Sequence, residues 1–221
     1  MTTYTESMVQ VRLPYQVPYA MQIASPELAA AIWEDGLDPA SDPRWVESGA
    51  DSPAEYAYWS DRACGPVCVK MCVEALGGPA RSMLDWVRAG LALDGYIIMH
   101  GAAGQTVERG WGHRALASLI QDAGFAAEAV PAWPAEIVDH LAAGRLIIAS
   151  VSAEIGMQAP ITHAGGHLVV VIGADMQDQQ PVTFIVHNPS GRSRATQASA
   201  TVPAERFAAA FTGRVIVASA E

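Results

Sequence analysis

A cysteine followed by Gly-Pro stands at Cys64, where an irregular stretch gives way to an apolar segment with helical spacing. Pro66 suits the first turn of a helix, because its missing N–H would have no partner there. A thiol at a helix start lies near unpaired backbone N–H groups and the positive end of the helix dipole. Both favour the thiolate, which is the nucleophilic form. The sequence therefore predicts that Cys64 is a nucleophile with a lowered pKa.

The other two cysteines are compatible with a purely structural alternative. Cys64, Cys68 and Cys72 are spaced by four, so all three could lie on one buried stripe of the helix. Free cysteine is among the most buried residue types. We expect Cys68 and Cys72 to be core residues, and the downstream sequence decides whether Cys64 differs from them.

A histidine and an asparagine occur at the ends of two later apolar segments. His167 follows Gly165-Gly166 and opens one segment, and Asn188 directly follows the next. If the two segments pair as an antiparallel hairpin, both side chains lie at the same edge of a sheet. A Cys, a His and an Asn in this order match a triad in which imidazole deprotonates the thiol and an amide orients the imidazole. Taken singly, a histidine at a strand end is usually structural and Asn-Pro usually marks a turn.

The elements that must position these residues follow from periodicity and turn signals. Helices are predicted at residues 26–33, 64–76, 82–93, 114–123, 134–143 and 204–211, and strands at 9–13, 146–151, 167–173, 182–187 and 215–218. The acidic stretch 34–60, with three prolines, and the glycine-rich stretch 95–112 show no period, so both are predicted to be irregular. Because most helices precede most strands, the pattern indicates an α+β fold.

Composition excludes several classes of function. The chain has 221 residues, of which 51% are apolar and 16% charged, as in a compact protein with one well-buried core. A net charge of −10 argues against binding nucleic acid or an anionic membrane surface. No apolar run reaches the roughly 18 residues that span a bilayer. The first ten residues show no export signal.

Cysteine and histidine usage favours neither disulfides nor metal. Three cysteines at helical spacing make a poor disulfide framework, so a cytoplasmic, reducing location is expected. His163 and His167 are four apart, but the glycines between them disfavour a helical metal pair. The glycine-rich stretch lacks both dinucleotide and P-loop spacing. We therefore expect neither a metal nor a cofactor.

Four segments together resemble a known family. They are Cys64-Gly65-Pro66, the run from Gly166 to Gly173, the run from Val186 to Gly191, and residues 206–217. On these motifs the chain resembles the stand-alone branch of the double-glycine, bacteriocin-processing peptidase family, within the papain-like cysteine peptidase superfamily. The likeness covers about residues 59–219.

The resemblance implies a papain-like α+β fold, with N-terminal helices packed on a mostly antiparallel sheet. It implies that Cys64 is the nucleophile, His167 the general base and Asn188 the orienting residue. It also divides the chain into a peptidase-like domain at residues 59–221 and an N-terminal extension at residues 1–58. The extension has no counterpart in the family, and we expect it to be irregular and to wrap the body.

The chain departs from the family at the oxyanion donor. The family usually carries a Gln six residues before the nucleophile, and this position is Tyr58 here. Tyr58 and Ser60 are therefore candidate donors, together with the backbone N–H of Cys64. Loss of one oxyanion donor can cost about 3–4 kcal/mol of transition-state stabilisation. There is also no transporter portion, so the resemblance does not imply leader cleavage coupled to export.

Further residues are candidates for binding substrate. Trp59 and Trp111 could line a cleft, with core packing as the alternative. His113 could line a pocket or cap a helix. Gly166 would let a substrate approach the backbone closely.

These observations predict a cysteine-nucleophile hydrolase or acyltransferase that acts on a peptide, amide or thioester. The acyl-enzyme would pass to water or to an amine. Transfer to an amine would make the protein a ligase or cyclase of a bacterial biosynthetic pathway. A catalytically inactive, peptide-binding protein is the alternative that Tyr58 favours. The expected partner is a peptide or an acylated small molecule, and the sequence predicts no oligomeric state.

Overall fold

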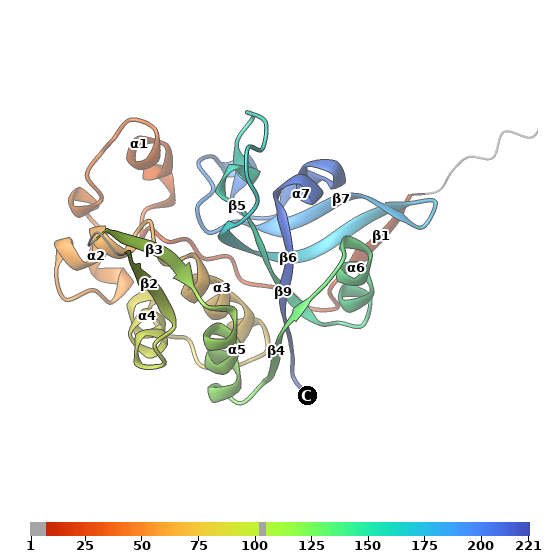
Figure 1. Cartoon of the computed structure of the whole chain (residues 1–221), viewed down its shortest axis with the longest axis horizontal. Coiled ribbons are helices and arrows are strands. Elements are labelled where there is room, and N and C mark those ends of the chain that lie inside the picture. The colour runs from red at the N-terminus through yellow and green to blue at the C-terminus, as the bar shows by residue number, and fades with distance from the viewer. Residues whose placement is uncertain (1–7, 102–104) are drawn as a thin grey trace, which may run out of the picture.

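A computed structural model describes residues 8–101 and 105–221. Residues 1–7, at the start of the predicted extension, and 102–104, within the glycine-rich stretch, lie outside the described residues. Figure 1 shows a helical part, with α1 to α5 and a small hairpin, beside a part built around one large sheet.

The large sheet has seven strands in the described part of the chain, and every neighbouring pair is antiparallel. Its strands are β1 (Val9–Arg12), β4 (Ala126–Pro131), β5 (Leu146–Ser152), β6 (Gly166–Gln177), β7 (Gln180–His187), β8 (Ala200–Pro203) and β9 (Phe211–Ser219). The order is β4-β9-β5-β6-β7-β8, and β1 pairs with β6. The predicted α+β class, with a mostly antiparallel sheet, is confirmed.

The centre of the sheet is buried on both faces, and its central strands contain continuous apolar runs. All seven residues of β5 are buried. Ile148 and Val170 pack into the core shared with the helical part, whereas their neighbours Ile147 and Val169 pack toward the opposite side. Alternate residues of a strand point to opposite faces, so these continuous apolar runs require cover on both.

Helices cover the two faces unequally. They are α1 (Ala29–Trp33), α2 (Pro53–Trp59), α3 (Cys64–Ala75), α4 (Met83–Ala92), α5 (His113–Asp122), α6 (Pro134–Ala142) and α7 (Ala204–Ala210). The first five contribute to the core shared with one face, and α6 and α7 pack on the other. Buried residues fill most of α3, which is the central helix of the helical part. The predicted helix at 204–211 ends one residue early, because Phe211 begins β9.

Two stretches predicted to be irregular contain regular structure. Helix α2 lies in the acidic stretch, where the Ser52 side chain accepts a hydrogen bond from the N–H of Glu55 and Pro53 occupies the first turn. These are ordinary helix-start signals. The glycine-rich stretch forms the hairpin β2 (Tyr96–His100) and β3 (Thr106–Trp111). Strands β4 and β8 were also not predicted, since both contain alanine, which has low strand propensity.

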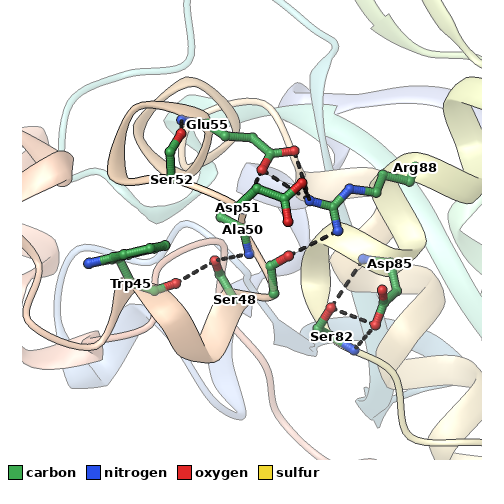
Figure 2. Close-up of polar contacts among 10 residues, drawn as sticks. Trp45, Ser48, Ala50, Asp51, Ser52, Glu55, Ser82, Asp85 and Arg88 are labelled. Atoms are coloured by element: carbon green, nitrogen blue, oxygen red, sulfur yellow. Dashed lines mark hydrogen bonds and ion pairs between the residues drawn. The ribbon is translucent and has the colours of Figure 1, made fainter.

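The segment before α2 is fastened to α4 by one arginine. The Arg88 guanidinium donates to the carbonyl of Gly49 at 3.0 Å and lies 3.0 Å from carboxylate oxygens of both Asp51 and Glu55. Figure 2 shows these contacts beside the capping box of α4, in which Ser82 and Asp85 bond reciprocally. This anchoring holds α2, and hence the residues leading to Cys64, against the rest of the helical part.

The antiparallel pairing of β6 with β7 brings two predicted site residues to the same edge. Val170 pairs with His187, so His167 at the start of β6 lies beside Asn188 at the end of β7. Gly165 and Gly166 precede His167 with φ angles of 93° and 90°, a left-handed conformation that other residues rarely adopt.

No helix in the described part of the chain is both long enough and apolar enough to cross a membrane.

Candidate active site

Cys64 is the first residue of α3, as the sequence predicts. Its partly exposed side chain lines a cavity of about 290 Å³. His167 lines the same cavity, and the backbone N–H of Leu168 favours the thiolate form of Cys64. The start of α3 and the start of β6 therefore meet at one cavity, which is lined by both the cysteine and the histidine.

Asn188 and Ser190 fix the tautomer of His167. The Nε2 atom of His167 lies 2.9 Å from Asn188 Oδ1, and the backbone N–H of Ser190 donates to that same oxygen at 3.1 Å. A backbone N–H needs an acceptor, so the amide oxygen faces the histidine and Nε2 carries the proton. Nδ1 is then the ring nitrogen that can accept a proton from a thiol.

The electrostatics of Cys64 differ from the sequence prediction. Burial raises the pKa of the Cys64 thiol to about 11, while backbone N–H groups of Leu168, Gly65 and Cys64 act in the opposite direction. The predicted lowering of this pKa is therefore wrong for the resting protein, because desolvation outweighs the helix-start N–H groups. Cys68 and Cys72 are fully buried core residues, as expected, and burial raises the pKa of each thiol.

Burial also opposes charge on His167. It lowers the pKa of His167 to about 4, and the hydrogen bond with Asn188 acts in the opposite direction. The imidazole is consequently neutral at physiological pH and available as a base. In the resting protein the Cys64 thiol and the His167 imidazole are therefore both neutral.

This resting state predicts how Cys64 reacts with iodoacetamide. With a pKa of about 11, the thiolate fraction should rise about tenfold per pH unit between roughly pH 7 and 10. Mass mapping should show alkylation of Cys64 before Cys68 and Cys72, which have no exposed surface. A Cys64 labelling rate that is already constant below pH 7 would contradict the neutral pair.

Side chains of hairpin β2–β3 form hydrogen bonds with Arg62, two residues before Cys64. The carboxylate of Glu108 on β3 accepts hydrogen bonds from Arg62 Nε at 2.8 Å and from the hydroxyl of Tyr96 at 2.9 Å. Hydrogen bonds from these two side chains hold the pKa of Glu108 below its usual value. Trp111 Nε1 donates to the carbonyl of Arg62 at 2.7 Å. Hairpin β2–β3 is thus tied to the residues immediately before Cys64.

The predicted substrate-binding residues are only partly brought together. Trp111, His113 and Gly166 line the cavity that holds Cys64. Trp59 does not, because it is 7% exposed and packs edge-on against Tyr96 at a centroid distance of 5.3 Å. For Trp59 the core-packing alternative is therefore the correct one.

Neither side chain predicted as an oxyanion donor lines the Cys64 cavity. The Tyr58 hydroxyl lies 3.4 Å from Glu108, and its ring lies under the Arg62 guanidinium. Ser60 is buried and its hydroxyl donates to the carbonyl of Ala57. The backbone N–H groups of Leu168, Gly65 and Cys64 act on the sulfur instead, since each favours the thiolate.

Removing the Tyr58 hydroxyl should therefore have little effect on catalysis. Because that hydroxyl makes only a long contact with an exposed carboxylate, we expect Tyr58→Phe to keep kcat/KM within about twofold of the wild type. Steady-state cleavage of a peptide substrate measures this. A fall of about 10²-fold or more would identify the hydroxyl as an oxyanion donor.

The N-terminal segment holds the turn that carries Asn188. The Tyr19 hydroxyl donates to the carbonyl of Asn188 at 2.8 Å, and the N–H of Gln22 donates to the carbonyl of Pro189 at 2.9 Å. His187 accepts from the N–H of Ser199 through Nδ1 and contacts the carbonyl of Val17 through Nε2 at 3.0 Å. Residues 17–22 form a strap behind the Asn188 turn.

Ser190 is a site residue that sequence reasoning missed. Its hydroxyl lies 3.0 Å from His167 Nε2 and 3.3 Å from Asn188 Oδ1. The signal was present, since Asn-Pro-Ser is an Asx-turn sequence in which the amide accepts from the N–H two residues on. The strap residues gave no such signal, because their contacts cross more than 160 positions of sequence.

The described residues contain no group of three or more His, Cys, Asp or Glu side chains that could hold a metal ion. His163, considered above as half of a metal pair, instead lies on the surface with Nδ1 3.6 Å from Glu154.

The structure combines a helix that begins with a cysteine and an antiparallel sheet that packs against it. The sheet carries a histidine and an asparagine on adjacent strand ends. This arrangement defines the papain-like class of α+β proteins. Residues 51–215 match the model of the Peptidase_C39 like family, which is well over half of the chain. The chain belongs to this family of double-glycine, papain-like cysteine peptidases.

Solved structures are similar at low identity. The peptidase domain of Streptococcus ComA, a bifunctional ABC transporter, is 16% identical with a TM-score of 0.50, over 72% of this chain and 93% of that domain. A double-glycine motif protease from an AMS/PCAT transporter, solved with its leader peptide, is 13% identical with a TM-score of 0.49, over 96% of this chain and 99% of that protein. No curated protein matches the chain.

Proposed function

We propose that the protein is a cysteine peptidase that uses Cys64, His167 and Asn188. The observation that carries the proposal is the 2.9 Å contact between His167 Nε2 and Asn188 Oδ1 at the edge of a cavity that Cys64 also lines. That contact leaves Nδ1 as the base and orients the ring, which is the role of the third member in such triads.

In the proposed reaction, His167 Nδ1 accepts the thiol proton as the Cys64 sulfur attacks the peptide carbonyl. The proton then passes to the leaving amine, the C–N bond breaks and an acyl-enzyme remains. Water then attacks the acyl-enzyme as it gives a proton to the same nitrogen, the thioester C–S bond breaks to release the acid product, and the proton returns to the Cys64 sulfur. Burial opposes each charge separately, but a thiolate and an imidazolium that form together attract each other in a poorly solvated site.

Backbone N–H groups supply the proposed oxyanion site. The N–H groups of Cys64 and Gly65 favour the thiolate of Cys64 and belong to the first turn of α3, where N–H groups lack helical partners. Donors fixed by a helix need no reorganisation as charge develops on the carbonyl oxygen. This arrangement replaces the missing Gln without a role for Tyr58 or Ser60.

We further propose that the N-terminal extension supports catalysis by holding the Asn188 turn through Tyr19 and Gln22. The extension would then be a positioning element for the peptidase-like domain at residues 59–221. A free thiol at position 64 also fits a reducing compartment such as the cytoplasm.

Digestion of a proteome-derived peptide library tests the proposed function. Mass spectrometry should detect new peptide termini with the wild-type protein and none with Cys64→Ala. Addition of a primary amine to the same digestion distinguishes hydrolysis from acyl transfer, because transfer would give peptides joined to the amine. Identical peptide profiles for the wild type and Cys64→Ala, with or without amine, would contradict the proposal.

A further inference from the structure

The cavity that holds Cys64 continues into a larger groove. The groove has a volume of about 870 Å³, within the range of ligand sites in proteins. It shares five lining residues with the Cys64 cavity, so the two are parts of one cleft: Arg109, Trp111, His113, Ser150 and Gly166. A substrate held at Cys64 would extend naturally along this groove.

Three arginines from three separate elements line the groove. Arg109 lies on β3, Arg114 on α5 and Arg214 on β9. No Asp or Glu is among the groove-lining residues, although the chain has 23 acidic and 13 basic side chains. The charge of the groove is therefore opposite to that of the protein as a whole.

Several arginines elsewhere in the protein are paired with carboxylates, unlike these three. Arg12, Arg62 and Arg88 each pair with a carboxylate within 3.0 Å. Within residues 8–101 and 105–221, no carboxylate forms an ion pair with any of the three groove arginines. Burial lowers the pKa of His113, which also lines the groove, and the positive charge of Arg214 lowers it further.

Clustered, unpaired guanidinium groups attract an anion, and their planar N–H forks match a carboxylate. The rest of the lining suits a peptide backbone and apolar side chains, since it includes Ala129, Val130 and Pro131 beside Trp111. We propose that this groove binds a carboxylate of the peptide substrate, either an acidic side chain near the cleaved bond or the chain end. The position of that bond relative to the groove rests on the proposed peptidase function.

A binding experiment with Cys64→Ala tests the groove without requiring turnover. The probes are an acetylated, amidated peptide of alternating Gly and Glu, its Gly-Gln counterpart, and the Gly-Gln peptide with a free carboxyl end. Calorimetry should show at least one carboxylate peptide binding about tenfold more tightly than the neutral peptide, the gain expected from a charge-assisted hydrogen bond. Added salt should weaken this binding. Comparison of the two carboxylate peptides shows whether the groove binds a side chain or a chain end.

Two triple variants in the Cys64→Ala protein locate the binding. Arg109→Gln, Arg114→Gln and Arg214→Gln together should abolish the carboxylate preference. Arg81→Gln, Arg145→Gln and Arg194→Gln remove the same charge outside the groove and should keep the preference, and thermal unfolding shows whether both proteins are folded. Equal affinity for all three peptides, or an equal loss in both triple variants, would overturn the groove proposal. Because Cys64 is absent from this experiment, the library digestion tests the peptidase proposal separately.

Discussion

Replacement of His167 by Ala should lower kcat/KM for peptide cleavage by about 10³-fold, because the base that takes the Cys64 proton is then missing. The measurement is steady-state cleavage of a peptide found by the library digestion. The fold should survive, because Asn188 Oδ1 keeps its hydrogen bond from the N–H of Ser190. His167 is buried, at 5% exposed, so thermal unfolding of the variant is measured beside its activity.

Asn188→Ala is the matched comparison for this variant. It should lower the rate less than His167→Ala does, because the Ser190 hydroxyl still contacts Nε2.

The pH dependence of wild-type activity gives a second test of the role of His167. Because the base must be neutral and its pKa is about 4, activity should persist as pH falls and be lost only near pH 4, rather than near 6.5. Activity of His167→Ala within about threefold of the wild type would exclude His167 as the base.

Replacement of Gly65 by Ala should disrupt both the fold and the site. A Cβ at this position would lie 2.8 Å from Cδ1 of Leu116 and 3.0 Å from Cβ of Trp111, both of which are buried. The start of α3 must then move, and overpacking of this kind costs about 1–3 kcal/mol of unfolding free energy. Because Cys64 is the adjacent residue, a small displacement should also lower kcat/KM by about 10²-fold.

Denaturant unfolding and steady-state kinetics measure the two effects of Gly65→Ala. Gly112→Ala is the control for the unfolding free energy, since its added Cβ would meet Ile97 at an ordinary 3.4 Å and its φ is −70°. If Gly65→Ala were as stable as this control and fully active, the start of α3 would tolerate a larger residue. The close packing would then not be what positions Cys64.

Strong apolar periodicity made the central fold predictable. Strand β5 and the first half of β6 are largely buried, and both are rich in β-branched residues, so their composition indicates strands. Hairpin β2–β3 gave no such signal, because four of the five residues of β2 are exposed and glycine interrupts β3. Helix α2 differs for another reason: the stretch that contains it has three prolines and no period, but Pro53 occupies the first helical turn, where proline is tolerated.

The candidate site was predictable where a single helix start or a single hairpin creates the geometry. Cys64 at a helix start and His167 beside Asn188 on a hairpin follow from local pattern and pairing. The charge state of Cys64 did not follow, because desolvation depends on the whole fold around the thiol. The arginine groove also did not follow, because its three charges come from residues separated by up to about a hundred positions.

Acylation of Cys64 tests the central claim most directly. The wild-type protein is mixed with p-nitrophenyl acetate, quenched in acid during the first turnover, and analysed by intact mass and peptide fragmentation. The proposed mechanism predicts one acetyl group per chain, located on Cys64 rather than on Cys68 in the same peptide, and no acetyl group on the Cys64→Ala protein. Acetylation at another residue, or product release from wild type and Cys64→Ala at equal rates, would contradict a cysteine-nucleophile enzyme.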